Sequence, residues 1–346
     1  MVKADFKDMD LEQTRAWIEK IGIDGYRAGQ IRHWLFRHQA ASFDEMTTIS
    51  KELRRYLDSH FFISRLKVVK IENSIDDSKK FLFELDDSNK IEAVLIPERD
   101  HYTLCISSQV GCAMGCKFCL TGKQGLIKNL RASEIINQII QVRQYMERPE
   151  KLTNIVFMGM GEPLANFDRV RTAVKNIISQ DGLGFSRRRV TLSTCGLVPK
   201  IEMFAIEMPI NLAVSINASD NETRDYLMPI NKKYPLHTLI EALRVFPLEK
   251  GRRITFEYVL IRDVNDSIKD ASNLVNLLRG VRAKINLIPF NHYDGSPFYA
   301  PDDEIIGAFK DVLIEKNFTA TIRRSKGGDI SAACGQLMTA REFSSL

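Results

Sequence analysis

The chain has 346 residues, of which 44% are hydrophobic and 27% are charged, so it can build a packed core and wholesale disorder is excluded. No stretch approaches the ~18 consecutive apolar residues of a membrane span, and the N-terminal MVKADFKDMD lacks the apolar region of a secretory signal. The net charge of +5 favours an anionic partner only slightly. We therefore expect a cytoplasmic protein, in which cysteines serve more often as metal ligands or catalytic groups than as disulfides.

Residues 1–60 are expected to form a small helical domain. In residues 10–22 the apolar side chains follow helical spacing, with Asp10 as N-cap and Gly22 as the stop. Residues 26–38 repeat this spacing and add several arginine and histidine side chains. An ordinary amphipathic helix explains this second segment, and an RNA-docking module is the alternative that its basic residues suggest.

The remaining chain changes pattern twice. Residues 61–98 alternate apolar and polar side chains between DDS and DDSN turns, which predicts a short antiparallel β meander that links two domains. Residues 99–346 alternate apolar runs with amphipathic helices, such as one beginning at Ser133 as N-cap, in six strand–helix units. Six units are too few for a closed eightfold barrel, so this α/β region is predicted to be a partial (β/α)6 barrel.

The unusual motifs all follow predicted strands. A cysteine cluster follows the first strand, MGMGEP the second, STCG the third, SINA the fourth and PFNHYDG the sixth. The carboxyl ends of parallel strands meet at one rim, where α/β folds bind their ligands. Five such loops on one rim predict a single binding site there.

The cysteine cluster has the spacing C-x3-C-x2-C, formed by Cys112, Cys116 and Cys119. Structural zinc takes four protein ligands, and Cys105, the nearest candidate for a fourth, lies within a predicted strand. A [4Fe–4S] cluster held by only three cysteines leaves one iron open. That iron can chelate S-adenosylmethionine (SAM) and pass it an electron, and this spacing is typical of radical SAM enzymes.

The other special residues are less informative by themselves. Glu162 of MGMGEP could accept a hydrogen bond from the SAM ammonium group, and the neighbouring glycines would let the backbone approach a ligand. Met158 and Met160 are expected to be packing residues. A lone cysteine is by default a buried structural thiol, and this default applies to Cys105, Cys195 and Cys334.

At this point the chain resembles a known family. It is similar to the RlmN family of dual-specificity RNA adenine-C2 methyltransferases in SSQVGCAMGCKFCLTGKQGLIKNL, FMGMGEPLAN, LMPINKKYPL, NLIPFN and DISAACGQL. The resemblance runs from YRAGQIRHWLF to AACGQL, nearly the whole chain. The sister Cfr family methylates C8 of the same adenine, and GEP and IPFN favour the C2 group over this alternative.

The resemblance implies roles for individual residues. Cys334 carries a methyl group as S-methylcysteine, Cys105 resolves it through a disulfide with Cys334, and Glu92 accepts a proton. Seven residues match the family's SAM contacts: Gly161, Glu162, Ser193, Ser215, Ile216, Asn217 and Asn291. In this sequence SIN stands at 215–217, where many members have Ser-x-His.

By the same resemblance, two SAM molecules are used to methylate adenine 2503 of 23S rRNA and adenine 37 of certain tRNAs. A flavodoxin-type protein is expected to donate electrons to the [4Fe–4S] cluster, and the enzyme is expected to be a monomer with no membrane partner. The N-terminal helices and the run Arg187, Arg188 and Arg189 are the candidates for RNA phosphate contacts.

Two other classes of function stay open. A radical enzyme that acts on a small molecule or a protein would use Cys334 only structurally, and it would show no salt-sensitive RNA binding. A zinc-stabilised RNA-binding module without catalysis would contain zinc and no sulfide.

Overall fold

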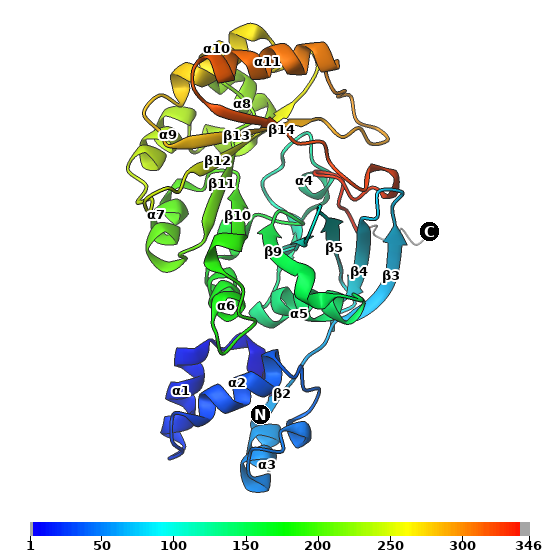
Figure 1. Ribbon diagram of the computed structural model, residues 1–346, viewed down its shortest axis with the longest axis vertical. Helices are drawn as coiled ribbons and strands as arrows, with labels where there is room; N and C mark the ends of the chain where they lie inside the picture. Colours follow the sequence, from blue (N-terminus) through cyan, green and yellow to red (C-terminus); the bar gives the residue numbers. More distant parts are fainter. Residues whose placement is uncertain (1–2, 340–346) are drawn as a thin grey trace.

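A computed structural model of the chain describes residues 3–339. The predicted helix start and stop near the N-terminus are confirmed, since the Asp10 carboxylate accepts the Gln13 N–H at 2.9 Å and Gly22 adopts a φ of +78°. The N-terminal unit lies at one end of the molecule (Figure 1). Its helices are α1 (Leu11–Lys20), α2 (Arg27–Phe36) and α3 (Lys51–His60).

A ten-stranded sheet with the order β14-β13-β12-β11-β10-β9-β6-β5-β4-β3 forms the centre of the molecule. Seven strands run parallel to one another: β6 (Tyr102–Cys105), β9 (Leu152–Phe157), β10 (Val190–Thr194), β11 (Asn211–Ser215), β12 (Ile254–Leu260), β13 (Ala283–Pro289) and β14 (Thr319–Ile322). The six predicted strand–helix units are confirmed as a partial barrel. The four-residue strand β14, which follows the last helix, is a seventh strand that the sequence analysis missed.

The predicted meander is also confirmed, and it extends the barrel sheet. Its antiparallel strands are β3 (Lys67–Asn73), β4 (Lys79–Glu84) and β5 (Lys90–Pro97). The last of these pairs antiparallel with β6, so that Val94 lies opposite Cys105. The meander therefore forms one wall beside the first barrel strand.

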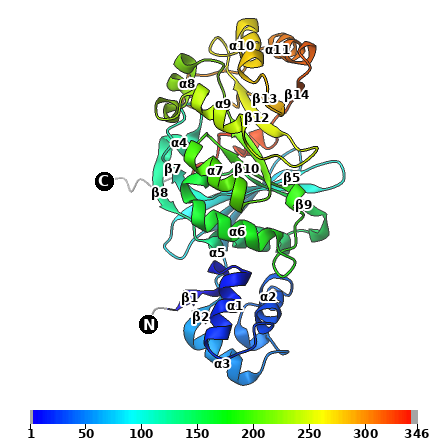
Figure 2. The ribbon, with the colours of Figure 1, turned by 90° about the vertical axis from the view of Figure 1, so that its left-hand side faces the viewer.

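Helices accompany the parallel strands (Figure 2). They are α5 (Ala132–Gln144), α6 (Phe167–Ile178), α7 (Val198–Glu207), α8 (Asn221–Leu227), α9 (Leu236–Arg244), α10 (Ile268–Leu277) and α11 (Asp303–Glu315). Helix α5 buries Ile135, Ile139 and Val142 completely, as its spacing predicts. The prediction of Ser133 as N-cap is wrong, because the helix begins at Ala132 and the Ser133 amide donates to Asp8.

The N-terminal unit is joined to α5 and α6 by buried polar contacts. Lys7 Nζ donates to Asn137 Oδ1 at 2.6 Å, and Arg32 Nη2 donates to Asn176 Oδ1 at 2.7 Å. Burial lowers the pKa of Lys7 to about 8 and that of Arg32 to about 10. Breaking these contacts would leave buried polar groups unpaired, so they fix the unit on the outside of the barrel.

A small hairpin on the barrel rim holds the cysteine motif. It pairs β7 (Gln109–Cys112) with β8 (Gly125–Asn129), and α4 (Leu120–Gln124) lies between them. Gly111 has a φ of +72°, and a Cβ there would collide with the carbonyl oxygen of Gly125. Only glycine therefore allows β7 and β8 to approach this closely beside the motif.

Candidate active site

The cysteine motif lies on one loop at the carboxyl end of the barrel. Cys112 ends β7, and Cys119 directly precedes α4. The Leu120 amide donates to the Gly335 carbonyl at 2.8 Å, which joins the loop to the end of the chain. Apolar residues of the loop pack on a second, smaller core that contains Cys195, Leu227, Met228, Ile261, Phe290, Tyr293 and Phe298.

The loop cysteines are suited to a cluster with three protein ligands. All three line one cavity, and burial raises the pKa of Cys112 to about 12 and that of Cys116 well above its usual value. Such thiols keep their protons until a metal displaces them. Within residues 3–339 no three His, Cys, Asp or Glu side chains converge on a single metal position. A [4Fe–4S] cube binds each cysteine through a different iron, so its ligands surround a volume instead. Cys112, Cys116 and Cys119 would hold it.

The same cavity collects most of the predicted SAM contacts. We call it the cysteine-loop cavity, and the strand ends of β9–β13 form its other walls. Besides the three cysteines, its lining includes the predicted residues Gly161, Glu162, Ser193, Ser215, Asn217 and Asn291. Ile216 does not line this cavity. Its side chain is fully buried in the main hydrophobic core, and its amide donates to the Glu257 carbonyl at 3.0 Å.

The glycines of MGMGEP are needed for packing. A Cβ on Gly159 would lie 2.8 Å from the Ile106 backbone, and one on Gly161 would lie 2.6 Å from Gln109 Cβ. From the sequence, these glycines were expected to make room for a ligand. In the structure they let the loop after β9 approach the segment between β6 and β7, which brings Glu162 beside the cysteine loop.

Glu162 is fixed by backbone donors. Its Oε1 accepts from the Leu164 amide at 3.0 Å, and its Oε2 accepts from the Cys195 amide at 2.8 Å. Burial raises its pKa, and these hydrogen bonds oppose that effect. A carboxylate has further lone pairs, so Glu162 can still accept from an ammonium group placed in the cavity.

Asn217 uses its side chain within the protein. Its Oδ1 accepts from the Val259 amide at 2.8 Å, and its backbone adopts a φ of +55°. An asparagine tolerates this left-handed conformation better than most residues. Asn217 therefore shapes the cavity wall.

Glu257 is a site residue that the sequence analysis missed. It lines the cysteine-loop cavity from β12, and its Oε2 accepts from Ser193 Oγ at 3.0 Å. Burial raises its pKa, while Arg323, 4.0 Å away, lowers it. The signal was present in RITFEYVL, where one acidic residue interrupts an otherwise apolar strand.

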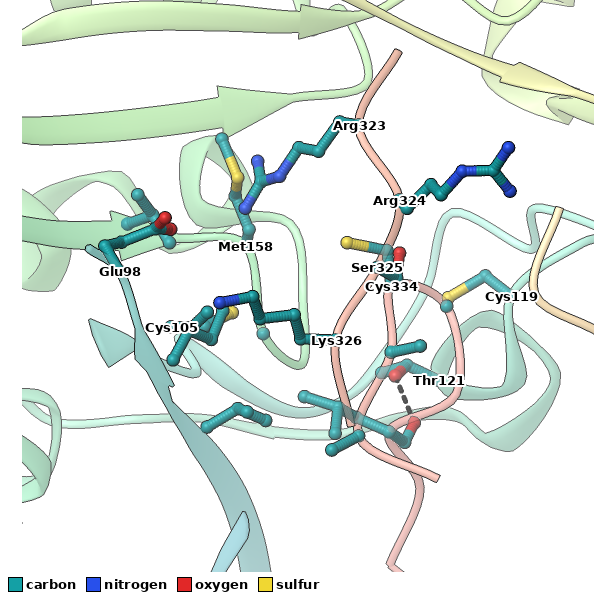
Figure 3. A pocket seen from close by; sticks show the side chains of 18 of the residues that line it. Glu98, Cys105, Cys119, Thr121, Met158, Arg323, Arg324, Ser325, Lys326 and Cys334 are labelled. Carbon is teal, nitrogen blue, oxygen red and sulfur yellow. Dashed lines mark hydrogen bonds between the residues drawn. The ribbon is translucent and has the colours of Figure 1, made fainter. Parts of the chain in front are cut away.

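A second cavity of about 310 Å³, which we call the Cys334 cavity, adjoins the first. Cys105 at the end of β6 and Cys334 near the C-terminus both line it, although they are distant in sequence. Figure 3 shows Cys105 on one side and Cys334 across from it on the last part of the chain, with Arg323 and Lys326 nearby. Five residues line both cavities: Cys119, Met158, Gly159, Cys334 and Gly335.

The two thiols of this cavity differ in exposure. Cys105 is buried, and burial raises its pKa to about 12, whereas Cys334 is exposed. Although the residue as a whole is exposed, the protein shields its thiol from water, and this desolvation raises the pKa of Cys334. The Arg323 guanidinium opposes this effect. All six cysteines are free, so the disulfide between Cys105 and Cys334 is absent from this structure.

The C-terminal segment, residues 323–339, is held by hydrogen bonds. Ser74 Oγ donates to Asp329 Oδ1 at 2.5 Å, and the Gly327 amide donates to Asp76 at 2.7 Å. Asn291 Nδ2 donates to the Cys334 carbonyl at 3.0 Å. These bonds, together with one from Thr121 to the Leu337 carbonyl, place Cys334 between the meander and the cysteine loop.

Glu92 is not brought into either cavity. It is buried on β5, where its Oε1 pairs with Lys80 Nζ at 3.3 Å and its Oε2 accepts from the Met338 amide at 3.0 Å. Leu337 lines the Cys334 cavity beside it. In this structure the C-terminal segment therefore occupies one oxygen of the Glu92 carboxylate.

The arginine run 187–189 lies elsewhere. It directly precedes β10, at the opposite end of that strand from Ser193. Arg187 pairs with Glu249 at 3.0 Å, and Arg188 faces a basic hollow with Lys284. The run is therefore remote from the mouth of both cavities.

Comparison with known proteins defines the chain's relatives. A protein of Desulfosudis oleivorans described as "Dual-specificity RNA methyltransferase RlmN" is 54% identical over 93% of this chain and 87% of the relative. A protein of Geotalea uraniireducens with the same description is 50% identical over 97% of both chains. The chain belongs to the RlmN family. It is therefore a radical SAM enzyme that methylates RNA.

Family models and a solved structure agree with this membership. Residues 106–275 match the Radical SAM superfamily, and residues 4–63 match the ribosomal RNA large subunit methyltransferase N-terminal domain. A crystal structure of a radical SAM methyltransferase from Sphaerobacter thermophilus is 42% identical, with a TM-score of 0.89 over 96% of this chain and 99% of that chain. Radical SAM enzymes of this kind bind a [4Fe–4S] cluster and SAM. Among residues 3–339, none of the helices has the length and apolar content to span a membrane.

Proposed function

We propose that this chain methylates C2 of adenine, at position 2503 of 23S rRNA and position 37 of tRNAs, through a methyl group carried by Cys334. The observation that carries the proposal is the wall shared by the two cavities. Cys334 lines both of them, so one sulfur can meet SAM on one side and Cys105 on the other. An RNA base would leave its stack to enter there.

The chemistry of adenine explains why a carrier is needed. C2 lies between two ring nitrogens and is too electron-poor to attack the methyl group of a sulfonium ion. When bound, the cluster supplies the electron that cleaves SAM and so generates a radical. The role left to the protein is to present a methyl carbon at C2 and to release the product.

Three side chains divide this work. The Cys334 thiolate displaces the methyl group from a first SAM, releasing S-adenosylhomocysteine. The bound cluster and a second SAM would supply the removal of one hydrogen atom from that S-methyl group. Its carbon then bonds to C2, Glu92 takes the C2 proton, and one electron leaves the adduct, for which the bound cluster would be the acceptor. The Cys105 thiolate then attacks the Cys334 sulfur, so that a sulfur–sulfur bond forms and the bond from that sulfur to the methylene carbon breaks. The released carbon takes up a proton, which gives the methylated base. An external dithiol must reduce this disulfide before the next turnover.

Methylation at C8, as in the Cfr family, is the alternative. The GEP and IPFN motifs and the names of the relatives support C2. Mass spectrometry of nucleosides from RNA treated with the anaerobically reconstituted enzyme tests this choice. We expect 2-methyladenosine, and 8-methyladenosine as the sole product would overturn the assignment.

The wider organisation is part of the same proposal. We assign RNA docking to residues 1–60, linkage to residues 61–98 and catalysis to residues 99–346. We also propose that the protein is a cytoplasmic monomer and that it receives electrons from a flavodoxin-type protein. The match of residues 4–63 to a ribosomal RNA methyltransferase N-terminal domain supports the docking role.

A further inference from the structure

We propose that Lys80 is a positioning residue that keeps the Glu92 carboxylate ionised and oriented to accept a proton. This inference rests on the role proposed above for Glu92. It concerns a lysine that lies on the meander, outside the barrel and outside both cavities.

The strand register places Lys80 next to Glu92. In the pairing of β4 with β5, Lys80 lies opposite Val94, and Glu92 lies opposite Leu82. The two charged residues are therefore diagonal neighbours on one face of the sheet, and Lys80 Nζ lies 3.3 Å from Glu92 Oε1. On β3, Glu72 lies opposite Lys80 and contributes a second carboxylate 3.1 Å from Nζ.

Burial makes this pairing consequential. Lys80 is 7% exposed and Glu92 is 5% exposed, so neither charge can rely on water. Glu72 is more exposed than Glu92 and has a second cation, Lys70, at 2.8 Å. The cation paired with Glu92 is Lys80. An ion pair removed from water loses far more when one partner is deleted than an exposed pair does.

Glu92 points toward the Cys334 cavity. Side chains at every second position share one face of a strand, so Glu92 shares its face with Val94 and Ile96. Both of these residues line the Cys334 cavity. Glu92 is the next position along this face, where the Met338 amide occupies its Oε2. The inference requires that the Met338 amide leave Oε2 during catalysis while Lys80 holds Oε1.

The charges around Glu92 support this assignment. Burial raises its pKa, and Lys80 is the largest opposing influence, followed by the Met338 hydrogen bond; Glu72 raises the pKa further. A protonated carboxyl cannot accept the C2 proton. Loss of Lys80 would therefore shift the ionisation of Glu92 to higher pH, and loss of Glu72 would shift it to lower pH.

The test uses the full chain with its reconstituted cluster and with Cys334 already methylated. Single-turnover methylation of an RNA hairpin is followed against pH in the parent and in Lys80→Met, Lys80→Arg, Glu72→Gln and Glu92→Gln. We expect the acid limb of the profile to move to higher pH by about 1 to 3 pH units in Lys80→Met, because Glu92 loses a close opposite charge. The arginine variant retains the parent profile, and Glu72→Gln moves the limb the other way.

The outcomes separate this inference from the function on which it rests. An active Glu92→Gln variant would overturn the role of Glu92 and this inference with it. An inactive Glu92→Gln variant with an unchanged acid limb in Lys80→Met would overturn the inference alone. Thermal melting and iron content identify variants that fold. Where Lys80→Met does not fold, Glu72→Gln decides, because an unmoved limb in that variant contradicts the inference.

Discussion

The cysteine-loop cavity and the Cys334 cavity share a wall, but the protein holds them in different ways. The first is lined by the cysteine loop, by Cys334 and Gly335, and mostly by the ends of parallel strands, whose positions are fixed by backbone hydrogen bonds along the sheet. The second is closed by the C-terminal segment, which side chains such as Asp76 and Asp329 hold in place. Under the proposed function, the first cavity would hold the radical chemistry, and the segment at the second would carry a sulfur that meets two reaction partners.

Removing a ligand in the rigid cavity has the largest expected effect. Cys116→Ala takes away one of three thiolates, so we expect loss of iron and sulfide, loss of SAM cleavage and no methylated RNA. Iron and sulfide analysis, together with detection of 5′-deoxyadenosine, measures this. Full SAM cleavage by the variant would contradict the assignment of the cluster.

The corresponding change in the tethered segment is expected to separate the two cavities. Cys334→Ala removes the proposed methyl carrier, so RNA methylation should fall to background. Iron content should equal that of the parent, because the cluster ligands are untouched. Methylation of RNA by the variant at the parent rate would contradict the proposed role of Cys334.

Gly161, which lines the cysteine-loop cavity and is a predicted SAM contact, should also matter through its packing. Gly161→Ala places a Cβ 2.6 Å from Gln109 Cβ in a backbone with a φ of +103°. Because the loop must move, we expect a loss of roughly 1 to 3 kcal/mol in unfolding free energy and weaker SAM binding. Thermal denaturation and SAM titration measure these effects. Gly295→Ala has a similar positive φ and open space around it, so its melting change reports the backbone cost alone, without a shift in SAM affinity.

The smallest effect is expected from weakening the hydrogen bonds that hold the C-terminal segment. Asp329→Ala removes the acceptor for Ser74 Oγ and for the Ile75 amide. We expect methyl transfer to RNA to slow by about tenfold, because a small misplacement of a reacting group is costly. Iron content and SAM cleavage should not change. A parallel loss of cleavage would show that the two cavities are not held independently.

The sequence predicted the rigid part of the site better than the tethered part. Each motif that follows a strand arrives at the rim, since parallel strands impose that meeting. Glu257 was missed because its strand looked like an ordinary core element, although it faces the cavity. The position of Glu92 beneath the Met338 amide depends on contacts between residues far apart in the chain, which periodicity does not encode. The resemblance supplied the roles of Cys105 and Cys334, and the structure supplied their common cavity.

The central claim is that the transferred carbon passes through Cys334. The most direct measurement loads Cys334 with a trideuterated methyl group from labelled SAM, removes that SAM, and then adds unlabelled SAM, reductant and RNA for one turnover. Our account predicts 2-methyladenosine with two of its three methyl positions deuterated, because one deuterium is removed before the carbon bonds to C2. A methyl group without deuterium, transferred directly from the second SAM, would contradict it.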